Sequence, residues 1–339
     1  MSTTASNPPT PALAPTQPLS ARRFTVPVEA CEVDKKENLK RYRQLWLKWM
    51  SWYEHRPDKP NRIESQINLM IFNDITYRSV VSGRGSSTMD SIASSTNPTL
   101  AYLVDQGYLL FQVLAIQKLL DRGPNVISIR RLLTDVRKNC KVITREVFVS
   151  GDGHPYDYNS WASRPEWRDD ALTRTWGLGS PHLTEYMISK QLHETFDVLS
   201  GKAPTQRRRD DTIRQSIFEA LNRWTNTNSA KEIERIRNDF IAHSADIVTQ
   251  NGPPQLFEVR FSQIDELQRS IVRVERTLTD CILSIRVARD VAPIQPLGIF
   301  SGLEVPYATP AAKEAMHKRW DELVMDRNSW KLNVLSDLK

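Results

Sequence analysis

Arg237 and His243 carry the side chains in this chain best suited to chemistry on a phosphate. An arginine presents a permanently charged planar fork that matches phosphate oxygens, and a histidine is the side chain that titrates near neutral pH. Asn238 could orient the phosphate or ribose by hydrogen bonds, and Asp239 could orient the histidine or raise its pKa. The spacing therefore places a phosphate-binding cation and a general base close together along the chain.

The segment from Ser229 to Ile247 is expected to hold these groups on one helix. Ser229 and Glu232 have the spacing of a capping box, which predicts the helix start. At about 100° per residue, Arg237 and His243 fall roughly 70° and 50° to either side of an apolar stripe. The residues of that stripe are Ile233, Ile236, Phe240 and Ile247.

The motif Arg-polar-x-x-x-Ala-His, late in a chain of helices, resembles the signature of the HEPN superfamily (higher eukaryotes and prokaryotes nucleotide-binding). Within that superfamily it is most similar to the abortive-infection AbiU-like families. The segments 115–139, 145–146 and 152–157 resemble the same families in the same order, so the resemblance covers about residues 62 to 290.

The resemblance implies a metal-independent endoribonuclease with Arg237, Asn238 and His243 as catalytic residues and Asp239 in a supporting role. Cleavage through attack of the RNA 2′-hydroxyl needs no cofactor. The resemblance also implies that the protein acts as a toxin in phage defence. It also implies a homodimer, because superfamily members place two such helices beside each other across a two-fold axis. An ideal helix separates Arg237 from His243 by about 9 Å and 120°, so one helix does not bring both onto one phosphate.

A simpler interpretation of the motif remains open. Asp239 lies four residues before His243 and could pair with it along the helix, while Arg237 could pair with Glu232 or Glu234. The chain would then be a non-catalytic RNA- or protein-binding module of the same fold. An antitoxin or another regulatory protein is a further expected partner.

The composition is that of a globular protein, with 40% apolar and 25% charged residues in 339, and only 12 glycines. The net charge of +6 is compatible with an anionic partner. No apolar run approaches the roughly 20 residues of a membrane span. The three cysteines are widely spaced, which favours a reducing, cytoplasmic location over disulfides or zinc.

The three-four spacing of apolar residues predicts an all-α, antiparallel helical bundle. Ser128 is expected to cap one of its helices. A final long helix is expected from Ser262 to about Asp290, with an inward face of Ile264, Leu267, Ile271, Val274, Leu278, Ile282 and Ile285. A Pro/Ser/Thr-rich tail at 1–32 is expected to be disordered, followed by a HEPN-like helical domain at 33–292. That domain is expected to carry an irregular insertion at about 150–181. Residues 293–339 are expected to form a C-terminal appendage with a short helix.

Two further features bear on function. Arg207, Arg208 and Arg209 form a basic run that is either a solvated loop or a contact to RNA backbone. His193 and Asp197 lie one helical turn apart, but no second pair at ligand spacing and no HExxH motif accompany them. The sequence therefore predicts no metal site.

Overall fold

The computed structural model describes residues 23–56, 58–85, 98–159, 181–238, 259–285, 290–301 and 310–330. Within these ranges ten α-helices account for the long elements, and the β structure is confined to two isolated bridges. The all-α class predicted from apolar periodicity is confirmed. The narrower HEPN-like assignment stays a prediction.

The observed helices follow the segments predicted from their apolar spacing, with ends shifted by a few residues. One local signal is confirmed at the start of α6, where the Ser128 side chain accepts a hydrogen bond from the backbone N–H of Arg131. The bounds are α2 (Lys36–Tyr53), α3 (Ile63–Gly85), α5 (Pro98–Leu120), α6 (Ile129–Lys138), α7 (Arg145–Ser150), α9 (Pro181–Ser200), α10 (Gln215–Thr225), α11 (Asn228–Ile236), α12 (Phe261–Arg276) and α13 (Pro310–Ser329).

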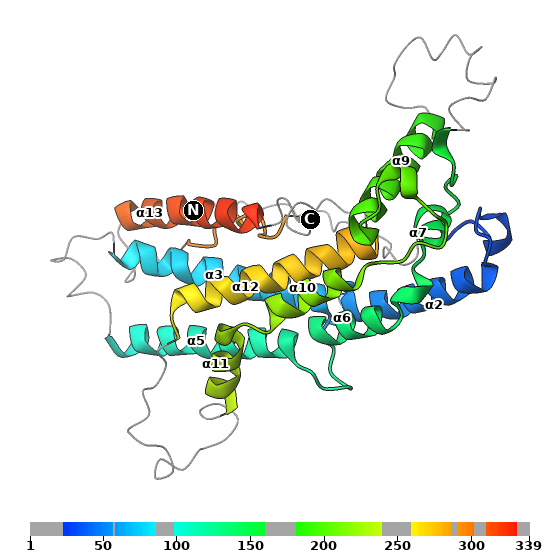
Figure 1. Cartoon of the computed structure of the whole chain (residues 1–339). Helices are drawn as coiled ribbons and strands as arrows, with labels where there is room; N and C mark the ends of the chain where they lie inside the picture. The colour runs from blue at the N-terminus through cyan, green and yellow to red at the C-terminus, as the bar shows by residue number, and fades with distance from the viewer. Residues whose placement is uncertain are drawn as a thin grey trace, which may run out of the picture.

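The helices α13, α3, α12 and α5 pack side by side along the length of the bundle (Figure 1). α13 packs on α3, α3 packs on α5, and α12 contacts both α3 and α5. α11 packs against α5 and α12 at the edge of the bundle opposite α13. α10 lies between α12 and α6 and contacts both. The C-terminal ends of α5 and α10 and the start of α6 therefore meet near α11.

α12 shows how closely the periodic pattern describes the core. The seven positions predicted to face inward are all buried: Ile264, Leu267, Ile271, Val274, Leu278, Ile282 and Ile285. The predicted end of the helix at Asp290 is wrong, because the α-helix ends at Arg276 and continues as a π-helix, η8 (Thr277–Ile282). The hydroxyls of Thr277 and Thr279 donate to carbonyls four residues earlier, at 2.8 and 2.9 Å, and such back-bonding bends helices.

The C-terminal helix α13 packs into the bundle, although the sequence predicted that residues 293–339 form an appendage. Arg327 of α13 is 2% exposed and donates to the buried carboxylate of Asp74 on α3 at 2.7 Å. It also pairs with Asp265 of α12 at 3.1 Å. Ala312, Met316, Trp320 and Leu323 join the same continuous core. α13 is therefore part of the bundle.

The described structure includes residues 23–32, which the sequence assigned to the disordered tail. Arg23 pairs with Asp152 at 2.7 Å and lies 4.7 Å above the ring of Trp46. Phe24 packs edge-on against that same indole ring, and Cys31 is buried. Residues 1–22 of the predicted tail and 160–180 of the predicted insertion lie outside the described residues.

Candidate nucleic-acid interface

α11 positions the candidate motif, and it starts two residues earlier than predicted. Its N-cap is Thr227, whose side chain accepts a hydrogen bond from the backbone N–H of Ala230 at 3.2 Å. The predicted capping box is wrong, because tertiary and surface contacts compete for its two side chains. Ser229 Oγ instead donates to Glu266 of α12 at 2.5 Å, and Glu232 pairs with Arg235 at 2.8 Å.

The inner face of α11 is the predicted one, as far as the structure describes it. Ala230, Ile233 and Ile236 are 8%, 1% and 6% exposed and pack toward α5 and α12. Phe240 and Ile247, the other two residues of the predicted stripe, lie outside the described residues. This burial fixes the rotation of α11 and hence the direction in which Arg237 leaves it.

Arg237 is the residue that follows the last turn of α11, at its C-cap position. Its Nε and Nη2 atoms donate to Oδ1 of Asn238 at 3.1 and 2.7 Å, which holds the guanidinium in one orientation. In the part of the chain that the structure describes, it pairs with neither Glu232 nor Glu234. The remaining donors of Arg237 are therefore available to an acceptor other than those two carboxylates.

Asp239 and His243 lie outside the described residues. The structure thus locates Arg237 and Asn238 together at the end of α11. The position of the histidine relative to them remains the prediction made from the motif.

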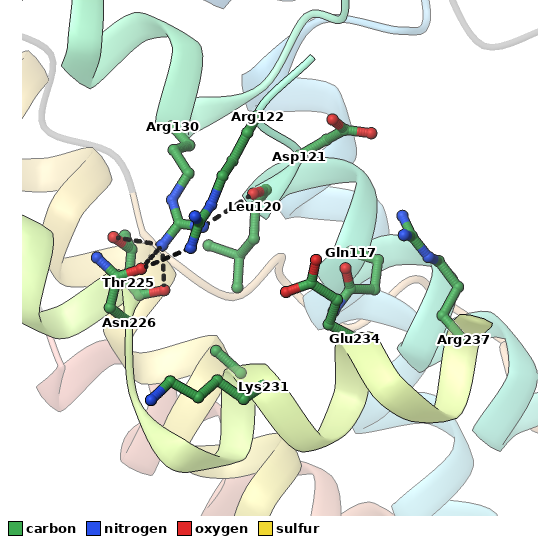
Figure 2. A pocket seen from close by; sticks show the side chains of 11 residues that line it. Gln117, Leu120, Asp121, Arg122, Arg130, Thr225, Asn226, Lys231, Glu234 and Arg237 are labelled. Atoms are coloured by element: carbon green, nitrogen blue, oxygen red, sulfur yellow. Dashed lines mark hydrogen bonds between the residues drawn. The ribbon is translucent and has the colours of Figure 1, made fainter. Parts of the chain in front are cut away.

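Arg237 lies on the rim of a pocket of about 120 Å³ that the sequence did not predict (Figure 2). Its walls come from the end of α5, the start of α6, the end of α10 and the exposed side of α11. The lining residues are Gln117, Leu120, Asp121, Arg122, Arg130, Thr225, Asn226, Ala230, Lys231, Glu234 and Arg237. Four of these side chains are basic and two are acidic.

Two arginines converge inside this pocket (Figure 2). Arg122 Nη2 donates to Oδ1 of Asn226 at 3.1 Å, and Arg130 Nη2 donates to the same oxygen. Arg130 also donates to the carbonyl of Thr225 at 2.6 Å. Burial lowers the pKa of Arg130, the charge of Arg122 lowers it further, and Glu234 opposes the shift. The pocket thus concentrates positive charge around one neutral amide.

The basic run at 207–209 is arranged differently, since each of its arginines already has a carboxylate partner. Arg207 pairs with Asp197 at 2.7 Å, and the hydrogen bonds that Arg207 donates to that carboxylate raise its pKa. Arg208 pairs with its neighbour Asp210 at 3.2 Å, and Arg209 with Asp34 at the same distance. Arg207 and Arg209 thus hold parts of the chain together and have less charge to offer a ligand.

His193 and Asp197 do not face a common ligand. His193 Nε2 lies 2.8 Å from the carbonyl of Tyr156, and Asp197 is held by Arg145 at 2.8 Å and by Arg207. Burial lowers the pKa of His193 to about 4. Among the described residues, no group of three or more His, Cys, Asp or Glu side chains is arranged to hold a metal ion.

No prediction from the sequence singled out Arg122, Arg130 or Asn226. The two arginines lie close together within the segment 115–139, but Asn226 follows Arg130 by 96 residues, at the end of another helix. The adjacent Arg130 and Arg131, in the first turn of the amphipathic helix α6, were the sequence feature that could have indicated a basic surface here. Their convergence depends on how α5, α6 and α10 meet.

None of the described helices is long and apolar enough to cross a membrane. Comparison of the chain with models of protein families, with curated proteins and with solved structures gives no match. Membership of the HEPN superfamily therefore remains a prediction made from the motif residues and their order in the chain.

Proposed function

We propose that this protein is a metal-independent endoribonuclease whose catalytic residues are Arg237, Asn238 and His243. The observation that carries the proposal is the guanidinium of Arg237. It is oriented by Asn238, it pairs with no carboxylate among the described residues, and it lies on the rim of a basic pocket. Such an arrangement suits a phosphate better than a structural ion pair.

The proposed reaction uses the RNA as its own nucleophile. His243 takes the proton from a 2′-hydroxyl, the 2′-oxygen bonds to the adjacent phosphorus, and the bond from phosphorus to the 5′-oxygen breaks. The leaving 5′-oxygen gains one proton from water, and His243 returns to water the one it took, so the products are a 5′-hydroxyl and a 2′,3′-cyclic phosphate. Arg237 stabilises the charge that develops on the phosphate oxygens, and Asn238 fixes the direction of the guanidinium. Asp239 would orient His243.

A second copy of the chain would complete the site. On an ideal helix Arg237 and His243 would be separated by about 9 Å and 120°, so a dimer that brings two such segments together can join one copy's arginine to the other's histidine. Mixing the inactive variants Arg237→Ala and His243→Ala tests this directly. Exchange of subunits should restore part of the activity, whereas a site contained in one chain would stay inactive.

The catalytic proposal is tested with purified protein and mixed RNA in excess chelator. The wild-type chain should cut RNA to 2′,3′-cyclic ends and leave DNA intact. His243→Ala and Arg237→Lys should both lose cleavage, because lysine keeps the charge but not the planar fork. His55→Ala, at an exposed histidine after α2, serves as the matched control. Full cleavage by the two motif variants, or none by the wild type, would refute the proposal.

A cellular role as a cytoplasmic toxin in phage defence, held in check by an antitoxin or another regulatory protein, follows from the same proposal. Overexpression of the wild-type chain should arrest growth, and the His243→Ala chain should be tolerated at equal abundance. Growth arrest by both the wild-type and the His243→Ala chain would mean that the toxicity comes from binding of RNA or protein and not from cleavage.

A non-catalytic RNA-binding module is the second candidate. The converging pair Arg122 and Arg130 supports it, because this feature requires no histidine and neither arginine belongs to the motif. Binding of RNA without cleavage, by the wild type and the His243→Ala variant alike, would favour this second function.

A further inference from the structure

The pocket beside Arg237 continues into a larger one. A second pocket of about 650 Å³ shares Arg122, Arg130 and Asn226 with the first, so the two are neighbouring parts of one groove. The second part is walled by Lys48 and Trp52 of α2 and by residues of α6, among them Arg131 and Lys138. The groove thus leads from Arg237 past the converging arginines to α2.

Basic side chains outnumber acidic ones along this groove by seven to three. The seven are Lys48, Arg122, Arg130, Arg131, Lys138, Lys231 and Arg237, and the three are Asp121, Asp135 and Glu234. Asp135 already accepts from Lys48 at 2.9 Å and from Trp49 at 2.7 Å. An excess of four positive charges is large beside the net charge of +6 of the whole chain.

Three arginines of the groove, Arg122, Arg130 and Arg131, are held in place by neutral partners, whereas Lys48 pairs with Asp135. Arg130 donates to Thr225 and Asn226, and Arg131 lies 4.3 Å above the ring of Trp52 while donating to a backbone carbonyl at 3.2 Å. Within the described residues, Arg122, Arg130 and Arg131 form no ion pair. The buried arginines elsewhere in the fold, such as Arg145, are paired with carboxylates.

Stabilisation of helix ends explains Arg130 in part but does not explain Arg122. Arg130 donates to Thr225, the last residue of α10, and its Nη1 lies 3.5 Å from the carbonyl of Leu120 at the end of α5. A cation is favourable at such C-terminal ends. Arg122 is exposed and donates to Asn226 alone among the described groups, which leaves four of its five N–H donors for a ligand.

We propose that this groove binds the phosphate backbone of single-stranded RNA, with Arg122, Arg130 and Lys231 on phosphates next to the one held by Arg237. The choice of RNA over an acidic protein rests on the proposed function, because the groove and Arg237 share one wall. Planar forks that approach an anion from several sides suit the oxygens of a phosphate. Lys231 lies six residues before Arg237, about 9 Å along α11, which spreads the contacts over more than one nucleotide.

Binding is measured separately from cleavage with a labelled, mixed-sequence RNA of about 20 nucleotides whose 2′-hydroxyls are all methylated. This probe cannot be cut by 2′-hydroxyl attack. The variants are Arg122→Gln, Lys231→Gln and the double variant, and the readout is fluorescence anisotropy at several salt concentrations. Arg319→Gln is the matched control, since Arg319 is half-exposed on α13 at the opposite edge and pairs with Glu322.

The double variant should bind the probe more weakly than the wild type at every salt concentration. Its plot of log affinity against log salt should be shallower by about 1.4, or about 0.7 for each phosphate that the protein no longer neutralises. Arg319→Gln should match the wild type in both respects. Circular dichroism verifies that each variant is folded. Arg130→Gln should weaken binding and also lower stability, because it removes hydrogen bonds at two helix ends.

An unchanged affinity and slope in the double variant would overturn the groove proposal even if the wild type cleaves RNA. Failure of the wild type to bind the probe would overturn it as well, and binding of polyglutamate instead would assign the groove to an acidic protein. Tight binding of the probe with the expected slopes, but no cleavage of unmodified RNA, would support the groove and refute the ribonuclease. If cleavage occurs, the double variant should raise KM and leave kcat near the wild-type value.

Discussion

Arg237 directs its guanidinium onto the side chain of the next residue, Asn238, through hydrogen bonds of 3.1 and 2.7 Å from Nε and Nη2. This relationship fixes the orientation of a charge that pairs with no carboxylate among the described residues. In the proposed reaction the amide oxygen of Asn238 therefore decides where the guanidinium points.

Asn238→Ala should slow RNA cleavage by about ten- to a hundredfold, because a hydrogen bond to a charged group contributes about 1.5–3 kcal/mol. The loss should appear in kcat more than in KM, since the charge itself remains. Asn68→Ala, at an exposed asparagine on α3, is the control. Equal activity of both variants would show that the orientation of Arg237 does not matter for catalysis.

Arg327→Met should destabilise the fold by about 1.5–3 kcal/mol, because it removes a charge-assisted hydrogen bond of 2.7 Å to the buried carboxylate of Asp74, which then keeps Arg78 and Tyr108 as partners. Equilibrium unfolding in urea followed by circular dichroism measures the loss. Arg319→Met on the same helix removes an exposed pair with Glu322 and should cost less than about 1 kcal/mol. Similar losses in both variants would mean that α13 is not held by Arg327.

The stability of the protein should fall in mild acid through His193. Burial is the main cause that lowers its folded pKa to about 4 from an ordinary 6.5. Between these pH values the unfolded chain binds a proton that the folded chain does not, so the contribution is present above pH 6.5 and is lost toward pH 4. It amounts to at most about 3 kcal/mol.

The geometry agrees with a neutral ring, since His193 Nδ1 is buried with no hydrogen-bond partner among the described residues and Nε2 faces the carbonyl of Tyr156. His193→Gln removes the titration and keeps a donor for that carbonyl. The free energy of unfolding should therefore depend less on pH in the variant between pH 7 and 4.5. Identical pH profiles would exclude His193 as the cause.

Only one of the three thiols should react quickly in the native protein. Burial raises the pKa of Cys281 to about 12, and it also raises the pKa of Cys31. Both are buried, whereas Cys140 is half-exposed. Because the thiolate is the reactive form, a thiol titration at pH 8 should give one fast group, with all three reacting in denaturant. Cys140→Ser should remove the fast group.

The periodicity of apolar residues determined the helices and most of the core by itself. In α12 the buried residues recur every three or four positions. This spacing identifies the inward face without any knowledge of which helices pack against it. The cap of α6 at Ser128 was predictable for a similar reason, since its partner is three residues away. Signals that act within one or two helical turns can be recognised without the fold.

Local signals failed where a distant residue competed for the same side chain. Ser229 was expected to cap α11 but donates to Glu266, and Arg327 lies in a segment expected to be an appendage but pairs with Asp74. Both partners are far away in sequence. The choice between a local and a distant partner depends on packing, which the pattern of residue types does not contain.

Packing also determines which arginines of this chain form ion pairs and which do not. In the sequence, Arg207 in a basic run was a more visible candidate for RNA than Arg122, which stands alone after a helix. Folding brings Asp197 to Arg207 and brings Arg130 and the neutral Asn226 to Arg122. The sequence determined the types and order of the charges and proposed the catalytic motif. The tertiary structure decided which charges are neutralised within the protein and which remain for a ligand, because an ion pair forms only where the fold places two opposite charges within reach.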